Sequence, residues 1–204
     1  MECDGIICVG LGRLAEFFRH LPLPFRLRLH RHRILQSRSK PFVTYLEDGL
    51  VVPLARGIED WASVLKGLIV GCLGIAVLAL LATFTGAAHW NFKLPSFASA
   101  RILSNFFFTS IPEEGFYRGF IQNTFCRYFE NIKLGKILAL ISTSILFAAA
   151  HYYWSPNLEI LAFVFLASLL YGGVYLISGK IESAILTHFL LNFIHMTFFS
   201  YHAM

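Results

Sequence analysis

The sequence predicts an all-α fold: a polytopic transmembrane helix bundle of about five spans that follows a basic N-terminal leader. Two observations predict this class. Hydrophobic residues make up 56% of the 204 residues and charged residues only 14%, whereas soluble domains carry about 25% charged residues. The apolar residues also gather in runs of roughly the 20 residues that a bilayer-spanning helix needs. We therefore divide the chain into a cytoplasmic or interfacial leader, residues 1–60, and a transmembrane core, residues 61–204.

The leader concentrates positive charge in a chain whose net charge is +5. Between Arg13 and Lys40 there are eight Lys or Arg residues and one acid, Glu16. Such a run beside apolar spans suits anionic lipid head groups and retention in the cytoplasm. A basic tract can also bind nucleic acid, but a membrane chain already accounts for the charge. We expect membrane lipids and no nucleic acid as partners, with residues 13–20 and 41–60 as surface segments.

Five apolar runs are predicted to span the membrane as helices, because a backbone in lipid must satisfy its hydrogen bonds within the segment. The loops after the second and fourth runs carry Lys and Arg, so we expect them on the cytoplasmic side with the leader, and the C-terminus outside. The protein is thus predicted to be an integral, multi-pass membrane protein, in the cell inner membrane if the source is bacterial. The runs cover about 67–87, 100–122, 137–154, 159–178 and 182–201.

The second run contains three charged residues, Glu113, Glu114 and Arg118. Ionisable groups inside a span are costly and are functional candidates by default. Glu114 and Arg118 are four residues apart and share a helix face, where they would form an ion pair. Glu113 points about 100° away and would stay available as a general base. A plainer interpretation is a helix start, because residues 110–113 resemble a capping box.

Two further runs carry polar residues at helical spacing. Phe147 and His151 are four residues apart in the third run, and His188 and Asn192 are four apart in the fifth, where His195 extends the same stripe. Plainer interpretations exist for both pairs. His151 could be an interfacial residue in an aromatic belt, and His188 with Asn192 could form a hydrogen-bonded seam between helices.

Together these residues supply the groups that peptide-bond hydrolysis requires. At a rise of roughly 1.5 Å per residue, Glu113, His151, His188 and Asn192 lie at overlapping depths near the middle of the membrane. A carboxylate base and imidazoles can activate water, and an amide can hold an oxyanion.

The order EExxxR, FxxxH and HxxxN, each on its own apolar run, resembles the CPBP family. This is the CAAX-protease and bacteriocin-processing group, also called Abi, which includes the type II CAAX prenyl endopeptidases. The resemblance implies a glutamic intramembrane endopeptidase without a cofactor that cleaves a membrane-associated peptide or protein. It implies a glutamate base, a water-activating histidine and an oxyanion-holding pair: Glu113, His151, and His188 with Asn192. It also implies an ion pair and a packing residue in support: Glu114 with Arg118, and Phe147.

Other functions for the same residues remain open. A zinc-dependent membrane protease of the same fold would use Glu113, His151 and His188 as ligands and leave a fourth position open. A non-catalytic membrane immunity or scaffold protein would use the polar residues only to join helices. A proton-coupled transporter could use intramembrane Glu and His, but the sequence shows no inverted repeat. Candidate substrates are prenylated CAAX proteins, bacteriocin or pheromone precursors, and sorting-tagged surface proteins.

Overall fold

The computed structural model describes residues 52, 54–93 and 98–201, which belong to one compact unit, Leu46–Met204. The predicted surface segment at 13–20, and most of the one at 41–60, lie outside the described residues.

The first long helix of the described chain is α4, Ile58–Phe84. It begins earlier than the predicted first span, because Glu59 and Asp60 in its first turn suit the positive end of the helix dipole. Gly86, with a φ of 78°, turns the chain after the helix. One stripe of α4 exposes a large apolar side chain at every fourth residue: Leu65 58%, Ile69 55%, Leu73 65% and Val77 63%. A contiguous apolar stripe of this length suits contact with lipid.

The predicted second span is part of a longer helical segment, residues 98–128, that changes register twice. Its pieces are α5 (Ala98–Ser104), η1 (Asn105–Ser110), α6 (Ile111–Glu114), η2 (Gly115–Gln122) and α7 (Asn123–Tyr128). The pieces η1 and η2 are π-helical, a wider form that is frequent at functional sites. Pro112 lacks an N–H and its ring crowds the carbonyl four residues earlier, which accounts for the wide turn before it.

The last three long helices lie close to their predicted positions. They are α8 (Gly135–His151), α9 (Leu158–Ser178) and α10 (Ile181–Phe198). Asn157 caps α9, because its Oδ1 accepts a hydrogen bond of 2.8 Å from the backbone N–H of Glu159. Gly179 ends the same helix in the left-handed region, with a φ of 66°.

A short two-stranded ribbon departs from the all-α prediction. The strands β1 (Ala88–Trp90) and β2 (Phe199–Tyr201) pair in antiparallel register, with His89 opposite Ser200. The predicted fifth span, about 182–201, therefore ends as a strand after Phe198. Strands of three residues are too short to show the alternating apolar pattern by which a sequence reveals a strand.

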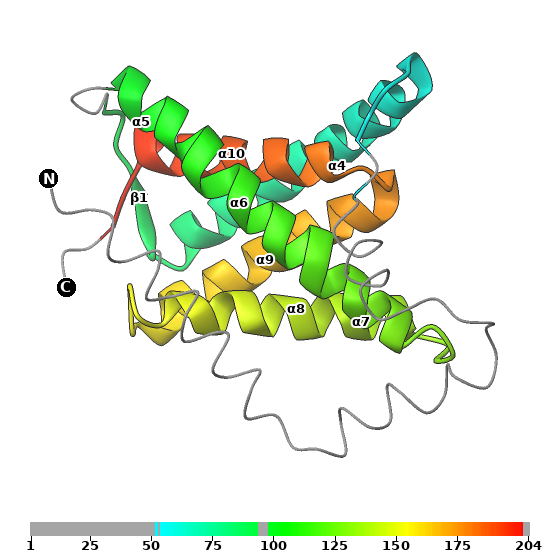
Figure 1. The fold of residues 1–204 in the computed structure, drawn as a ribbon. Helices are drawn as coiled ribbons and strands as arrows, with labels where there is room; N and C mark the ends of the chain where they lie inside the picture. Colours follow the sequence, from blue (N-terminus) through cyan, green and yellow to red (C-terminus); the bar gives the residue numbers. More distant parts are fainter. Residues whose placement is uncertain (1–51, 53, 94–97, 202–204) are drawn as a thin grey trace, which may run out of the picture. The chain divides into compact units, whose positions relative to one another are not determined.

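Helix α9 occupies the centre of the helical core. Figure 1 shows it between α8 on one side and α4 with α10 on the other, and α9 contacts all three. The segment 98–128 contacts α10 through η1 and α6, and α8, α9 and α10 through η2. Close packing of α4 on α10 depends on small residues, since a Cβ on Gly71 would clash with the side chain of Thr187. This packing brings α8, α9, α10 and the residues around Glu113 to one place.

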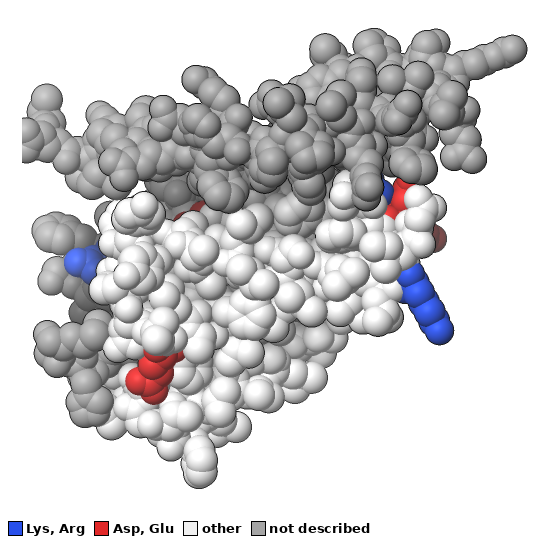
Figure 2. Space-filling view, turned by 90° about the horizontal axis from the view of Figure 1, so that it is seen from below, with Lys and Arg blue, Asp and Glu red and all other residues white. Residues whose placement is uncertain are grey.

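Two helices of the described chain, α4 and α9, are long and apolar enough to cross a membrane, judged by length and composition. Only 22% and 33% of their most apolar windows are buried, unlike the core helix of a soluble domain. Helix α8 is apolar but shorter. Figure 2 shows a face on which uncharged side chains cover most of the described surface. The arrangement of five spans, and its orientation, stays a prediction.

Candidate active site

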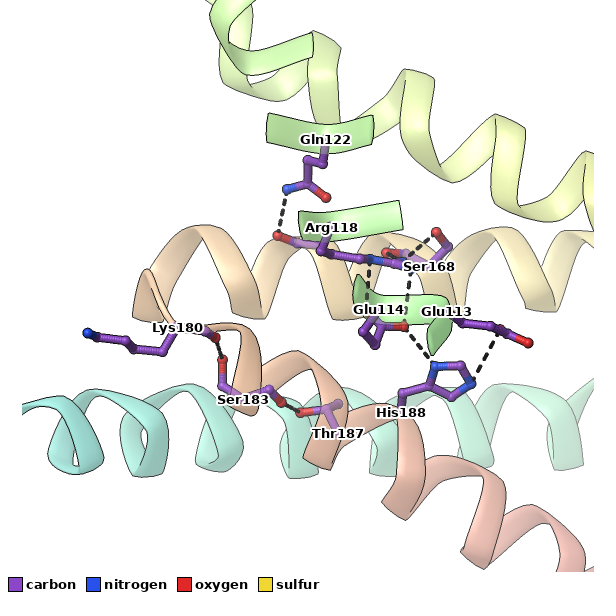
Figure 3. Close-up of polar contacts among 10 residues, drawn as sticks. Glu113, Glu114, Arg118, Gln122, Ser168, Lys180, Ser183, Thr187 and His188 are labelled. Carbon is purple, nitrogen blue, oxygen red and sulfur yellow. Dashed lines mark hydrogen bonds and ion pairs between the residues drawn. The ribbon is translucent and has the colours of Figure 1, made fainter. Parts of the chain in front are cut away.

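A fully buried ion pair joins Glu114 and Arg118, as their spacing predicts. The Nε of Arg118 lies 3.1 Å from Oε2 of Glu114, and both side chains are 0% exposed. The Nη2 of Arg118 also donates to the backbone carbonyl of Ser168 at 2.8 Å and to its Oγ at 2.7 Å (Figure 3). Buried charges need such additional hydrogen bonds, because removing them from water is expensive. We call Glu114, Arg118 and Ser168 the buried network.

His188 connects the buried network to Glu113. Its Nδ1 lies 2.7 Å from Oε1 of Glu114, and its Nε2 lies 4.0 Å from Oε2 of Glu113 (Figure 3). A carboxylate only accepts hydrogen bonds, so Nδ1 of His188 carries a proton. The imidazole also stacks on the ring of Tyr171, with centroids 4.5 Å apart and planes at 10°. The ring of His188 is therefore held both at its edge and on its face.

Glu113 has different surroundings from Glu114, its neighbour in the chain. Its side chain is 31% exposed, and its Oε2 makes no hydrogen bond among the described residues. One step along a helix turns the side chain by about 100°, which directs Glu113 away from Arg118. Glu113 is thus the acid that can act on another molecule.

His151 lies at the C-terminal end of α8. Its Nδ1 lies 2.8 Å from the backbone carbonyl of Phe147, and because a carbonyl only accepts, Nδ1 carries the proton. The other nitrogen, Nε2, then bears a lone pair in the neutral ring. Phe147 itself is 2% exposed, and the guanidinium of Arg118 lies 4.9 Å from the centroid of its ring. Phe147 thus packs between the imidazole of His151 and the buried network.

Asn192 is oriented by a second amide, Asn105. The Nδ2 of Asn105 donates to the carbonyl of Phe189 at 3.2 Å, which fixes the direction of the Asn105 amide. Its Oδ1 then accepts a hydrogen bond of 3.0 Å from Nδ2 of Asn192. An amide nitrogen has two hydrogens, so Asn192 keeps one that this bond does not use.

A cavity of about 460 Å³ is lined by all four residues that are predicted to be catalytic. Its remaining walls are mostly apolar and come from α4, α8, α9 and α10, and Tyr171 and His195 also line it. This volume lies in the range of ligand-binding pockets. The four residues are Glu113, His151, His188 and Asn192.

The comparison with protein families decides the assignment. A family model described as Rce1-like, Type II CAAX prenyl endopeptidase Rce1-like, matches residues 95–194. The chain belongs to the CAAX-protease family. All seven residues predicted for the site lie within the matched range, so the resemblance that the three motifs indicate is confirmed at the level of the family. No curated protein and no solved structure matches the chain.

Three polar residues around this candidate site were not predicted: Asn105, Ser168 and Tyr171. A signal existed for Ser168 and Tyr171, which are three residues apart and share a face of α9, an otherwise strongly apolar helix. Asn105 gave no comparable signal, because its direction depends on the π-helical turn η1.

The described residues contain no group of three or more His, Cys, Asp or Glu side chains arranged to hold a metal ion. Glu113, His151 and His188 line one cavity without forming such a group.

Proposed function

We propose that this CAAX-family protein is an intramembrane endopeptidase that hydrolyses a peptide bond of a membrane-associated substrate with water activated by Glu113 and His151. The observation that carries the proposal is the different placement of two adjacent carboxylates. Glu114 is fully buried and engaged by Arg118 and His188, whereas Glu113 lines the cavity with a side chain that is 31% exposed. Glu113 is therefore the carboxylate positioned to take a proton from water.

The attacking water would lie beside the carboxylate of Glu113, which lines the cavity. Nε2 of His188 lies 4.0 Å from Oε2 of Glu113, too far for a direct hydrogen bond, so His188 does not occupy this carboxylate. Glu113 takes one proton as the water oxygen attacks the scissile carbonyl carbon. The Nε2 lone pair of His151 accepts a hydrogen bond from the other hydrogen of the water, which stays on the attacking oxygen, and so directs the attack.

The tetrahedral oxyanion would be held by His188 and Asn192. His188 already carries a proton on Nδ1, directed at Glu114, so it donates to an oxyanion only as the imidazolium, from Nε2. Asn192 donates the amide hydrogen that its bond to Asn105 leaves unused. Preorganised donors of this kind stabilise charge that develops only in the transition state.

Collapse of this intermediate completes the hydrolysis. The carbon–nitrogen bond breaks, the oxyanion returns to a carbonyl, and Glu113 passes its proton to the leaving amine. The products are a carboxylic acid and an amine, and no covalent bond to the protein forms. Glu113 ends as the carboxylate, ready for another water.

The substrate class follows from the family and the cavity. The family model is described as a type II CAAX prenyl endopeptidase, and the walls of the cavity are mostly apolar. We propose a substrate with a C-terminal CAAX sequence whose cysteine carries a prenyl group. The apolar walls would receive the apolar parts of such a chain.

The test is cleavage of a prenylated CAAX peptide by purified wild-type protein and by Glu113→Gln. Glu159→Gln is the matched control, because Glu159 lines the same cavity at the first turn of α9. We expect Glu159→Gln to cleave normally and Glu113→Gln to leave the peptide intact. Cleavage by Glu113→Gln at the wild-type rate would reject the mechanism. If wild-type protein cuts neither the prenylated peptide nor the same peptide without its lipid, the substrate class is wrong.

A zinc-dependent protease is the second candidate, and one observation favours it. His151 and His188 each direct Nδ1 at an acceptor, Phe147 O and Glu114 Oε1, the support that zinc-ligating histidines usually have. Elemental analysis of purified protein, beside activity in chelator, separates the two candidates. Stoichiometric zinc that is lost and restored together with activity would establish the zinc enzyme. Full activity in metal-free protein would establish the mechanism proposed above.

A further inference from the structure

Tyr171, on the central helix α9, is the closest aromatic neighbour of His188. The two rings are nearly parallel, at 10°, with centroids 4.5 Å apart, a separation at the short end of the range for stacked aromatic pairs. Tyr171 is 2% exposed and also lines the cavity. A phenol ring is therefore packed flat against the imidazole that the proposed function places at the oxyanion.

The other contacts of His188 do not fix its ring plane. The hydrogen bond from Nδ1 to Glu114 holds one edge, about which an imidazole can still tilt. Phe147 meets the imidazole edge to face, at 74° with centroids 6.1 Å apart. Removing the ring of Tyr171 would leave the imidazole free to tilt and would move Nε2 away from its place 4.0 Å from Glu113.

The position of Tyr171 is itself fixed by the buried network. The guanidinium carbon of Arg118 lies 5.3 Å from the centroid of the Tyr171 ring, within the range of a cation–π contact. Arg118 is in turn held by Ser168, one turn earlier on α9. The ring of Tyr171 thus contacts both the guanidinium of Arg118 and the imidazole of His188. Because Arg118 is held in place, the ring of Tyr171 can hold His188 in place at the cavity.

We propose that Tyr171 is a positioning residue for His188, and that its aromatic ring, not its hydroxyl, sets the plane in which Nε2 meets the reacting carbonyl. This inference rests on the proposed function, because it takes His188 to act in the reaction. It predicts that any flat aromatic ring at this position preserves turnover. It also predicts that an aliphatic side chain lowers kcat and leaves KM nearly unchanged, since Tyr171 acts on the transition state through His188.

The test compares Tyr171→Phe with Tyr171→Leu in steady-state cleavage of the prenylated CAAX peptide. We expect Tyr171→Phe to keep the wild-type kcat and Tyr171→Leu to lose about tenfold to a hundredfold, the cost of a misplacement of order 1 Å. Tyr175→Leu is the matched control. Tyr175 lies one turn later on α9, is 7% exposed and hydrogen-bonds Asn123. The Tyr175→Leu protein should be less stable than the wild type but should not lose a comparable part of its kcat per folded molecule.

Three results would overturn the inference. One is a wild-type kcat in Tyr171→Leu, another is an equal loss in Tyr171→Phe, which would assign the effect to the hydroxyl, and the third is an equal kcat loss in Tyr175→Leu. Should Tyr171→Leu not fold, Tyr171→Met fills a similar volume without a ring and is judged by the same criteria. His188→Ala in the same assay distinguishes a failure of this inference from a failure of the proposed function. If His188→Ala stays active, the proposed function fails, whereas if only Tyr171→Leu stays active, this inference alone fails.

Discussion

The buried network and the cavity wall each contain one of two adjacent glutamates, yet the two carboxylates have different surroundings. In the buried network, the side chains of Glu114 and Arg118 are 0% exposed and form an ion pair, and Arg118 also donates hydrogen bonds to Ser168. On the cavity wall lie Glu113, whose side chain is 31% exposed, and His151. The Oε2 of Glu113 makes no hydrogen bond to the described residues. The Nε2 of His151 keeps its lone pair, because the proton of the neutral ring is on Nδ1, which donates to the carbonyl of Phe147.

Neighbours in the sequence can have different functions when one step along a helix points their side chains in different directions. Glu113 and Glu114 carry identical side chains, but only Glu114 lies on the face that Arg118 shares. We therefore expect changes in the buried network to act on folding, and changes on the cavity wall to act on turnover. His188 lies near Glu114 in the buried network and Glu113 on the cavity wall, so changes at His188 should act on both folding and turnover.

His151→Ala should lower turnover about as strongly as Glu113→Gln, because it removes a group that directs the attacking water. Loss of a positioned acid–base group typically costs about 10²–10⁴-fold. The variant should fold as well as the wild type, since its ring lies at the end of α8 and is only partly buried. The measurement is kcat per folded molecule beside thermal stability in detergent. Normal turnover in His151→Ala would place His151 outside the reaction.

Arg118→Ala should instead act on folding. Breaking a buried ion pair by removing one partner typically costs about 3–5 kcal/mol, because the remaining charge is left uncompensated. The yield of folded protein should fall sharply, and Arg118→Lys should recover only part of it, because lysine cannot reproduce the forked contacts to Glu114 and Ser168. A fluorescent fusion monitored by size exclusion gives the yield. An Arg118→Ala protein that folds normally and has lost only activity would erase the distinction between the two regions.

Asn192→Ala should lower turnover, because losing one oxyanion donor usually raises the activation barrier by about 2.7–4 kcal/mol. Substrate binding should change little, because the oxyanion exists only near the transition state. Asn192→Asp should be worse, since it puts a negative charge beside the oxyanion. Separate determination of kcat and KM checks this, and a rise in KM at constant kcat would show that Asn192 binds substrate instead.

Asn105→Ala should have the smallest effect, in the same direction as Asn192→Ala. It removes the acceptor that orients the Asn192 amide, a neutral hydrogen bond worth about 0.5–1.5 kcal/mol. A double-mutant cycle with Asn192→Ala tests the link. The two losses should be far from additive if Asn105 acts through Asn192, and additive losses would assign Asn105 a separate role.

The apolar pattern predicts most of the helical core. The bounds of α9, Leu158–Ser178, differ by one residue from the expected span, because a polar cap and a glycine mark its two ends. The ribbon of β1 and β2 could not be predicted, since its partners are far apart in the chain and each strand has three residues. The π-helical turns in 98–128 could not be predicted either, because the apolar pattern there indicates only a regular helical period.

In the candidate site, too, the sequence predicts local contacts but not contacts between helices. Local spacing correctly predicts the contact between Glu114 and Arg118, because residues four apart on a helix must be neighbours. The bond between His188 and Glu114 was not predicted, since it joins α6 to α10 and depends on how the helices pack. The catalytic roles of Glu113, His151, His188 and Asn192 stay predictions that only kinetics can test.

The central claim is that Glu113, not Glu114, takes the proton from the attacking water. The most direct test is the single-turnover rate constant for cleavage of a prenylated CAAX peptide by Glu113→Gln and by Glu114→Gln, each normalised to folded protein. We expect a loss of about 10²–10⁴-fold in Glu113→Gln. We expect a smaller loss per folded molecule in Glu114→Gln, whose main defect is a lower yield of folded protein. A rate constant that is normal in Glu113→Gln and lost in folded Glu114→Gln would contradict it.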